Sequence, residues 1–422
     1  MKRRTFLATG LAALTGFPRA RAAGVSIAEA FDREMESFMN ARGIPGGSLA
    51  VVKDRRLVYA RGYGLADRER KVAAEADSLF RIASVSKPFT AVAVMKLIED
   101  GKLTLEQRAF DLVQLEPWQK GDERLAAITI RQLLHHTGGW NRHTRSDPMF
   151  RSRKIAQAAG VPSPAPPEAI IRFMLGEPLD FDPGTQYVYS NFGYCVLGRV
   201  IEKVTGRTYE EFVRAEILAP LGIRRMRIGA SLDGKQAGGE VRYYTKDDGA
   251  GDSVFEEGKK VAFPYGGFCL EAMDSHGGWI ASAVDLARFA AALGDPARCP
   301  VLNKESFAKL DEPPSAPVSR KADGSLADRF YACGWQVRPV GKNGAANYWH
   351  DGSLPGTATL LVRRWDGLSW AALFNQRSED PALPDGAIDR ALHRAAHATG
   401  EWPTEDLFAG MGFHPAFAPS HD

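Results

Sequence analysis

One stretch, residues 80–100 (FRIASVSKPFTAVAVMKLIED), constrains the fold more than any other part of the chain. From Pro88 to Ile98 almost every residue is apolar, and a helix that is apolar on all sides is usually buried in a large core. Pro88 suits the first turn of a helix, where a missing N–H costs little. Gly101 stands where a left-handed residue commonly ends a helix. The pattern predicts a central, buried helix.

Ser84 and Lys87 lie at the start of this helix. Unpaired amides and the positive end of the helix dipole gather there, and both favour a developing oxyanion. Residues three apart share a helix face, and a buried ammonium is costly unless it is paired or neutralised. The pair therefore predicts a nucleophile and its activator, with a simple helix cap as the alternative. A second S-x-x-K match, Ser306 and Lys309, lies in a charged amphipathic stretch and predicts a solvated lysine.

The amino-terminal segment accounts for the positive net charge. Residues 1–22 hold five basic residues and no acidic one, which leaves 49 basic and 51 acidic residues in the remainder. No basic surface for nucleic acid is implied. The segment also resembles an export signal: RRTFL at residues 3–7 matches the twin-arginine pattern, an apolar run too short to span a bilayer follows, and ARA at residues 20–22 suits cleavage. We expect a periplasmic or secreted protein without stable membrane insertion after processing.

The cysteines are widely spaced and form no C-x-x-C pair, so zinc or redox use has no support and buried free thiols are expected. The four are Cys195, Cys269, Cys299 and Cys333.

Strand patterns occur at both ends of the chain, with helical patterns between them. A capping box at Ser26 opens a helix that ends at Gly43. The expected strands are 48–53, 57–63, 333–337, 346–350, 357–364 and 368–375, the last two joined by an Asp-Gly turn. The other expected elements are a mostly helical lobe (about 102–220), an exposed loop or lid (242–260), an amphipathic helix (282–293) and a closing helix (385–399).

The predicted fold class is therefore α/β (α+β), with one antiparallel sheet built from the amino- and carboxyl-terminal strands. Helices flank this sheet, and the helical lobe is inserted between its two sets of strands. We expect residues 23–400 to form this domain and residues 401–422 to form a tail.

Two further motifs carry chemistry. Tyr189-Ser190-Asn191 is the one Y-x-N in the chain. A nearby ammonium could lower the tyrosine pKa enough for base catalysis, and an asparagine can orient a lysine or a substrate amide; an aromatic core loop is the alternative. In residues 350–356 (HDGSLPG), glycine permits close approach to a ligand, and the amide of Ser353 could donate to an oxyanion. The alternative for this motif is a hairpin turn with an exposed histidine.

Taken in this order, SVSK at residues 84–87, YSN at 189–191 and HDG at 350–352 resemble the serine β-lactamase and penicillin-binding protein superfamily, within it the class C β-lactamase-related branch. The likeness spans roughly residues 30–400. Supporting segments are LLHHTGG (133–139), PGT (183–185), GGW (277–279) and DLARF (285–289).

The resemblance implies a β-lactamase/transpeptidase-like fold and a serine hydrolase with no cofactor or metal. It implies that Ser84 is acylated, that Lys87 and Tyr189 share the acid–base work, and that Asn191 holds Lys87 or a substrate amide. Which of Lys87 and Tyr189 takes the proton stays open. The resemblance also places His350, Gly352 and Ser353 at the substrate, with the amides of Ser84 and Ser353 as oxyanion donors.

Departures from the β-lactamase pattern bear on the substrate. His350 stands where β-lactamases carry the lysine of K-T-G and would be only partly charged at neutral pH. Asp351 replaces the hydroxyl residue and would repel a carboxylate if it faced the site. We expect a monomeric esterase, amidase or D-peptidase that acts on a small molecule or peptide. The alternatives are a true class C-type β-lactamase, or a penicillin- or cell-wall-ligand-binding module without turnover.

Other enzyme classes have little support. The chain has no G-x-S-x-G for an α/β-hydrolase and no H-E-x-x-H for a metallohydrolase. His135 and His136 are adjacent, whereas metal ligands on one helix face are four residues apart. We expect these histidines to cap or cross-link the helical lobe.

Overall fold

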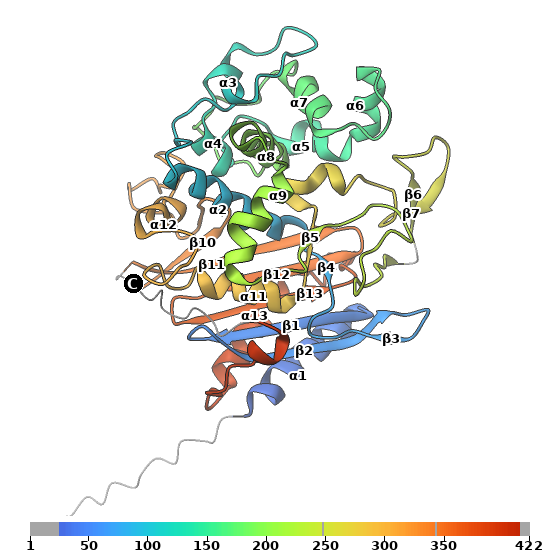
Figure 1. Ribbon diagram of the computed structural model, residues 1–422, viewed down its shortest axis with the longest axis vertical. Helices are drawn as coiled ribbons and strands as arrows, with labels where there is room; N and C mark the ends of the chain where they lie inside the picture. Colours follow the sequence, from blue (N-terminus) through green and yellow to red (C-terminus); the bar gives the residue numbers. More distant parts are fainter. Residues whose placement is uncertain (1–24, 247–248, 342–343, 414–422) are drawn as a thin grey trace, which may run out of the picture.

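An eight-stranded sheet forms the centre of the computed structural model, which describes residues 25–413 except 247–248 and 342–343 (Figure 1). The expected export signal lies outside the described residues. All pairings in the sheet are antiparallel, in the order β3-β2-β1-β13-β12-β11-β10-β9. The strands are β1 (Gly46–Lys53), β2 (Arg56–Asp67), β3 (Val72–Ala73), β9 (Phe330–Tyr331), β10 (Gln336–Val340), β11 (Ala345–Leu354), β12 (Thr357–Arg363) and β13 (Leu368–Phe374).

The pairing of β1 with β13 joins the two ends of the chain, from Gly47 opposite Phe374 to Lys53 opposite Leu368. The predicted sheet of amino- and carboxyl-terminal strands is therefore confirmed. One strand was misplaced, because the strand predicted at 333–337 begins only at Gln336, and the short β9 was missed.

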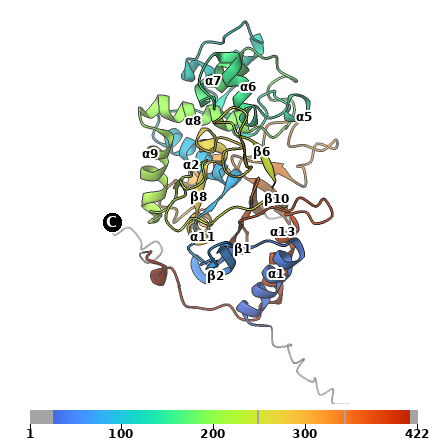
Figure 2. The same cartoon turned by 90° about the vertical axis from the view of Figure 1, so that its right-hand side faces the viewer.

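Both faces of the sheet are covered. Successive side chains of a strand point to opposite faces, and in β1 the alternation separates two cores. Leu49 and Val51 pack with α1 (Ile27–Arg42) and α13 (Ala387–Ala398), which lie side by side on one face (Figure 2). Ala50 and Val52 belong to the core on the other face.

The predicted central helix is α2 (Ser86–Glu99), and eleven of its fourteen residues are buried. It ends before Gly101, which has the expected positive φ of 69°. Helix α11 (Ala283–Ala292) begins at the predicted cap Ser282 but is not amphipathic in its setting, because all ten of its residues are buried. It packs between the sheet and the rest of the core, where Asp285 accepts hydrogen bonds from Ser282.

Helices form the lobe above the sheet in Figure 1. They are α3 (Ala109–Val113), α4 (Ile130–Leu134), α5 (Arg142–Arg145), α6 (Ser152–Ala159), α7 (Pro167–Leu175), α8 (Asn191–Thr205) and α9 (Tyr209–Val213). The segment 242–260 is less irregular than expected. Tyr243 and Tyr244 anchor it as buried residues, and it contributes the hairpin of β6 (Ala250–Asp252) and β7 (Lys260–Ala262).

A small second sheet leads into the predicted nucleophile, with β8 (Trp279–Ala281) between β4 (Phe80–Arg81) and β5 (Arg227–Ile228). The four cysteines are free, as expected, although Cys299 is only partly buried. Within residues 25–413, apart from the two short gaps, no helix is both long and apolar enough to cross a membrane.

Phe89 tests the central position of α2. Its ring stacks on Phe289 of α11 with centroids 3.8 Å apart, and it is fully buried. Phe89→Ala should lower the free energy of unfolding by about 3–5 kcal/mol because it leaves a cavity. Trp365→Ala, at a side chain 57% exposed, is the control and should change it by less than about 1 kcal/mol. Equal effects of the two variants in denaturant unfolding would contradict this packing.

Candidate active site

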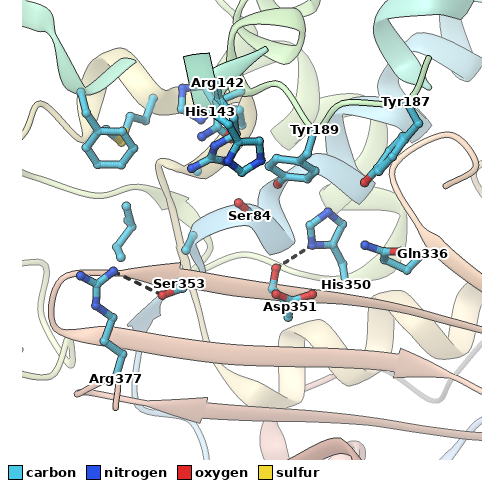
Figure 3. Close-up of a pocket in the computed structure, with 17 residues that line it drawn as sticks. Ser84, Arg142, His143, Tyr187, Tyr189, Gln336, His350, Asp351, Ser353 and Arg377 are labelled. Carbon is cyan, nitrogen blue, oxygen red and sulfur yellow. Dashed lines mark hydrogen bonds between the residues drawn. The ribbon is translucent and has the colours of Figure 1, made fainter. Parts of the chain in front are cut away.

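A cavity of about 490 Å³ brings the predicted site residues together where β11, the start of α2 and the helical lobe meet (Figure 3). Five of the seven predicted residues line it: Ser84, Tyr189, Asn191, His350 and Ser353. Lys87 and Gly352 are buried behind its wall. The competing pair Ser306 and Lys309 lies elsewhere, on α12 (Lys304–Leu310), where Lys309 pairs with Glu305.

Ser84 sits in a tight turn, the 3₁₀ helix η1 (Ala83–Val85) between β4 and α2. Ala83 has a φ of +47°, a conformation that is costly for a residue with a side chain. Hydrogen bonds hold the turn: Ser86 Oγ donates to the Ala83 carbonyl at 2.7 Å, and Thr359 Oγ1 donates to the Ile82 carbonyl at 3.0 Å. The sheet and α2 thus fix the turn that presents Ser84 to the cavity.

The Lys87 amine is fully buried and directed at Ser84. Its Nζ lies 3.1 Å from Ser84 Oγ, 2.7 Å from Asn191 Oδ1 and 2.8 Å from the carbonyl oxygen of His276. Burial lowers the pKa of Lys87 well below its ordinary value, although Asp147 and Asp351 oppose that effect. Two of the three neighbours are carbonyl oxygens, which only accept. A neutral amine therefore gives them its two protons and turns its lone pair to the Ser84 hydroxyl.

Asn191 is itself oriented by a residue that the sequence did not indicate. Its Nδ2 donates to Asp147 Oδ2 at 2.6 Å, so its Oδ1 faces Lys87. The other oxygen of Asp147 accepts from the amide of Met149 at 3.1 Å. An aspartate before a proline is typical of a turn, so the Asp147-Pro148 pair gave no signal for a role in the site.

Tyr189 departs from expectation in its protonation. The Lys87 amine lies 4.7 Å from the centre of its ring, yet burial raises the pKa of Tyr189 well above 10, against a smaller lowering by Ser84. The predicted lowering is wrong because desolvation dominates and the nearby Lys87 amine has itself lost its preference for the charged form. The hydroxyl finds no hydrogen-bond partner among the described residues, and it points toward Ser84 in Figure 3. At neutral pH the side chain is a phenol that can donate.

His136 holds the Tyr189 segment in place. Its carbonyl accepts from the amide of Val188 at 3.0 Å, and its Nδ1 accepts from the amide of Ser190 at 3.1 Å. The imidazole ring lies 4.3 Å from the Tyr189 ring, centre to centre. The neighbouring His135 meets Cys333 Sγ at 3.4 Å. The expected cross-linking within the helical lobe is confirmed for His136, whereas His135 links the lobe to Cys333 outside it. The contact of His136 with the Tyr189 ring was not predicted.

His350 is buried, not an exposed turn residue. Its Nδ1 lies 2.7 Å from the Asp351 carbonyl, which only accepts, so Nδ1 carries the proton. Its Nε2 lies 2.9 Å from the Tyr331 hydroxyl and accepts from it. Burial is the main cause that lowers the pKa of His350 to about 4. The expectation of a partly charged histidine is therefore wrong: His350 is neutral at pH 7.

The register of β11 gives the direction of the Ser353 N–H, the predicted second oxyanion donor. Leu354 and Thr357 close the two-residue hairpin as a hydrogen-bonded pair, so Ser353 opposite Ala358 is a non-hydrogen-bonded pair. The Ser353 N–H therefore points away from β12, toward the other edge of β11. The pairing with β10 ends at Trp349, so this edge is unpaired at Ser353, and β11 contacts η1 here. A side chain at Gly352 would meet the Ile82 carbonyl at 2.4 Å, so glycine allows this close approach.

Comparison with known proteins gives one family for most of the chain. The family model described as Beta-lactamase matches residues 31–395. Penicillin-binding protein 4* of Bacillus subtilis is 26% identical over 82% of this chain and 71% of its own length.

Solved structures share the fold. An octameric penicillin-binding protein homologue from Pyrococcus abyssi has a TM-score of 0.64 at 24% identity, over 87% of this chain and 78% of that one. D-amino acid amidase from Ochrobactrum anthropi SV3 has a TM-score of 0.65 at 23% identity, over 88% and 98%.

Two variants test whether His136 positions Tyr189. His136 has a φ of +57°, which both asparagine and glycine accept, but only asparagine offers an acceptor in place of Nδ1. His136→Gly should lower the acylation rate by about 10- to 100-fold, the range for a small misplacement of a reacting group, and His136→Asn should restore most of it. Equal rates for the two variants in stopped-flow acylation would show that the Ser190 contact does not matter.

The neutral state of His350 predicts a loss of stability in acid. The unfolded chain binds a proton on this histidine near pH 6.5 and the folded protein near pH 4, so lowering the pH between these values favours unfolding, by up to about 3 kcal/mol. His350→Gln should lose less stability than the parent from pH 7 to pH 4 in denaturant titrations. His397→Gln, at an exposed position, should behave like the parent. The same loss in all three proteins would contradict the assignment.

Proposed function

The chain belongs to the beta-lactamase family, and on that premise we propose that it is a serine hydrolase that forms an acyl-enzyme on Ser84 and cleaves an ester or amide bond. One observation carries the proposal: the Ser84 hydroxyl lies 3.1 Å from a fully buried Lys87 amine whose pKa is lowered. A weak oxygen nucleophile is activated by an adjacent general base that takes its proton, and such a base works best when its pKa lies near the working pH.

Acylation begins when Ser84 Oγ attacks the substrate carbonyl carbon and passes its proton to the Lys87 amine. The amides of Ser84 and Ser353 stabilise the negative charge on the carbonyl oxygen. As the bond to the leaving group breaks, the leaving oxygen or nitrogen takes a proton from the Tyr189 phenol, which is replenished from the Lys87 ammonium. Because a Tyr189 phenolate is unfavourable, the two transfers occur together.

Deacylation reverses these roles. A water molecule attacks the acyl carbon and gives a proton to Lys87, and Ser84 leaves with the proton returned to it. The lowered pKa of Lys87 and the raised pKa of Tyr189 favour Lys87 as the base in both steps.

The substrate side of the cavity favours an esterase, amidase or D-peptidase over an efficient β-lactamase. His350 is neutral, and Asp351 lines the cavity, so the HDG motif itself supplies no cation for a substrate carboxylate, unlike the lysine of K-T-G. The named relatives, two penicillin-binding proteins or homologues and one amidase, fit either outcome. We also propose that residues 1–22 direct export, on the strength of the twin-arginine pattern.

Active-site labelling tests the nucleophile. A fluorophosphonate or a fluorescent penicillin should label the parent, and Ser84→Ala should lose the label. Lys87→Ala should slow labelling by about 10²- to 10⁴-fold, the range for general-base catalysis. Ser306→Ala and Lys309→Ala remove the second S-x-x-K pair and should label like the parent.

Labelling that survives in Ser84→Ala would contradict the proposal. Turnover is then measured with p-nitrophenyl esters, D-amino-acid amides and a chromogenic cephalosporin. Steady product release from esters or amides is the expected result. A burst of acylation without turnover on every substrate would identify a binding module instead.

A further inference from the structure

The catalytic cavity carries opposite charges on different sides of Ser84. Asp351 lines one side together with Tyr187 and Gln336, and Arg377 lies beyond Ser353 on the other side (Figure 3). Arg142 and His143 approach from the lobe. A substrate bound at Ser84 therefore meets a carboxylate on one side and guanidinium groups on the others.

No ion pair among the described residues, 25–246, 249–341 and 344–413, neutralises Asp351, which is exposed. The adjacent His350 is neutral. The Arg142 guanidinium forms its ion pair with the buried Asp147, at 3.9 Å, and not with Asp351. The field of Asp351 nevertheless reaches the site, because it raises the pKa of Lys87 and that of Tyr187.

The surroundings of Asp351 suit a cation. The ring faces of Tyr187 and Tyr189 attract an ammonium through their π-electrons, and the side-chain oxygen of Gln336 can accept a hydrogen bond from it. Asp351 and Ser353 are two residues apart on β11, about 7 Å along a strand and on the same face. A cation within two or three bonds of the scissile carbonyl therefore comes within reach of the carboxylate.

We propose that Asp351, with Gln336 and Tyr187, binds an ammonium group next to the scissile carbonyl, so that the substrates are amino-acyl esters or amides with a free amine. The inference rests on the proposed serine hydrolase and names its substrate class. Asp351 acts as a specificity-determining residue: it attracts the ammonium and repels acyl groups that carry a carboxylate.

Three forms of one substrate test the proposal at pH 6.5, where the amine is protonated. Both enantiomers of phenylalanine p-nitroanilide are compared with their N-acetyl and N-succinyl derivatives on the full chain. The parent should favour the free amine over the N-acetyl form by at least about tenfold in kcat/KM and reject the N-succinyl form. Asp351→Asn should shrink the preference for the free amine by about 10- to 100-fold, the range of a hydrogen bond to a charged group, mainly through KM.

Asp351 also raises the pKa of Lys87, but this effect changes kcat/KM for all three forms of the substrate alike. It therefore cancels in the ratio of kcat/KM between the free-amine and N-acetyl forms. Glu379→Gln, an exposed carboxylate away from the cavity lining, is the matched control and should keep the parent ratio. A parent that hydrolyses the N-acetyl form as well as the free amine would overturn the inference. An unchanged ratio in Asp351→Asn would also overturn it.

The failure of the underlying function gives a different result. If no derivative is hydrolysed and Ser84 takes no fluorophosphonate label, the proposed hydrolase is wrong and the inference falls with it. If Ser84 is labelled and neutral esters are hydrolysed, but amine-bearing substrates gain nothing, only the inference fails.

Discussion

The contact between the buried Lys87 amine and the Ser84 hydroxyl is the interaction on which the site depends. An amine held at 3.1 Å from the hydroxyl and removed from water loses its preference for the charged form. The carbonyl oxygens of Asn191 and His276 then decide its orientation, since each takes one of its protons. The lone pair of the amine is then directed at the Ser84 hydroxyl, the orientation that a base for this hydroxyl requires.

The fold supplies that burial from three distant parts of the chain. Ser84 and Lys87 lie at the start of the central helix α2. Strand β11 comes close to the Ile82 carbonyl because Gly352, the β11 residue that faces it, has no side chain. The helical lobe brings Asn191 and Tyr189 from the other side, with His136 fixing the latter. Because β1 and β13 are paired, the sheet needs both ends of the domain.

Much of this arrangement was accessible from sequence patterns. The uninterrupted apolar run located α2, β-rich runs located most of the sheet, and the three motifs located Ser84, Tyr189 and His350. The protonation states could not be predicted, because they depend on burial that the lobe and sheet create together: Tyr189 is a phenol and His350 is neutral. Contacts made by backbone atoms could not be predicted either. Lys87 donates to the backbone carbonyl of His276, and every residue has such a carbonyl, so the residue type gives no signal.

The protonation of Lys87 is the most direct test of this account. Heteronuclear NMR on lysine-labelled protein, with the signal assigned by a Lys87→Arg variant, follows the amine through a pH titration. The pKa of Lys87 should lie well below 10.5, the ordinary value for lysine. A pKa at or above 10.5 would mean that the ammonium persists beside Ser84, and it would contradict the assignment of Lys87 as the base.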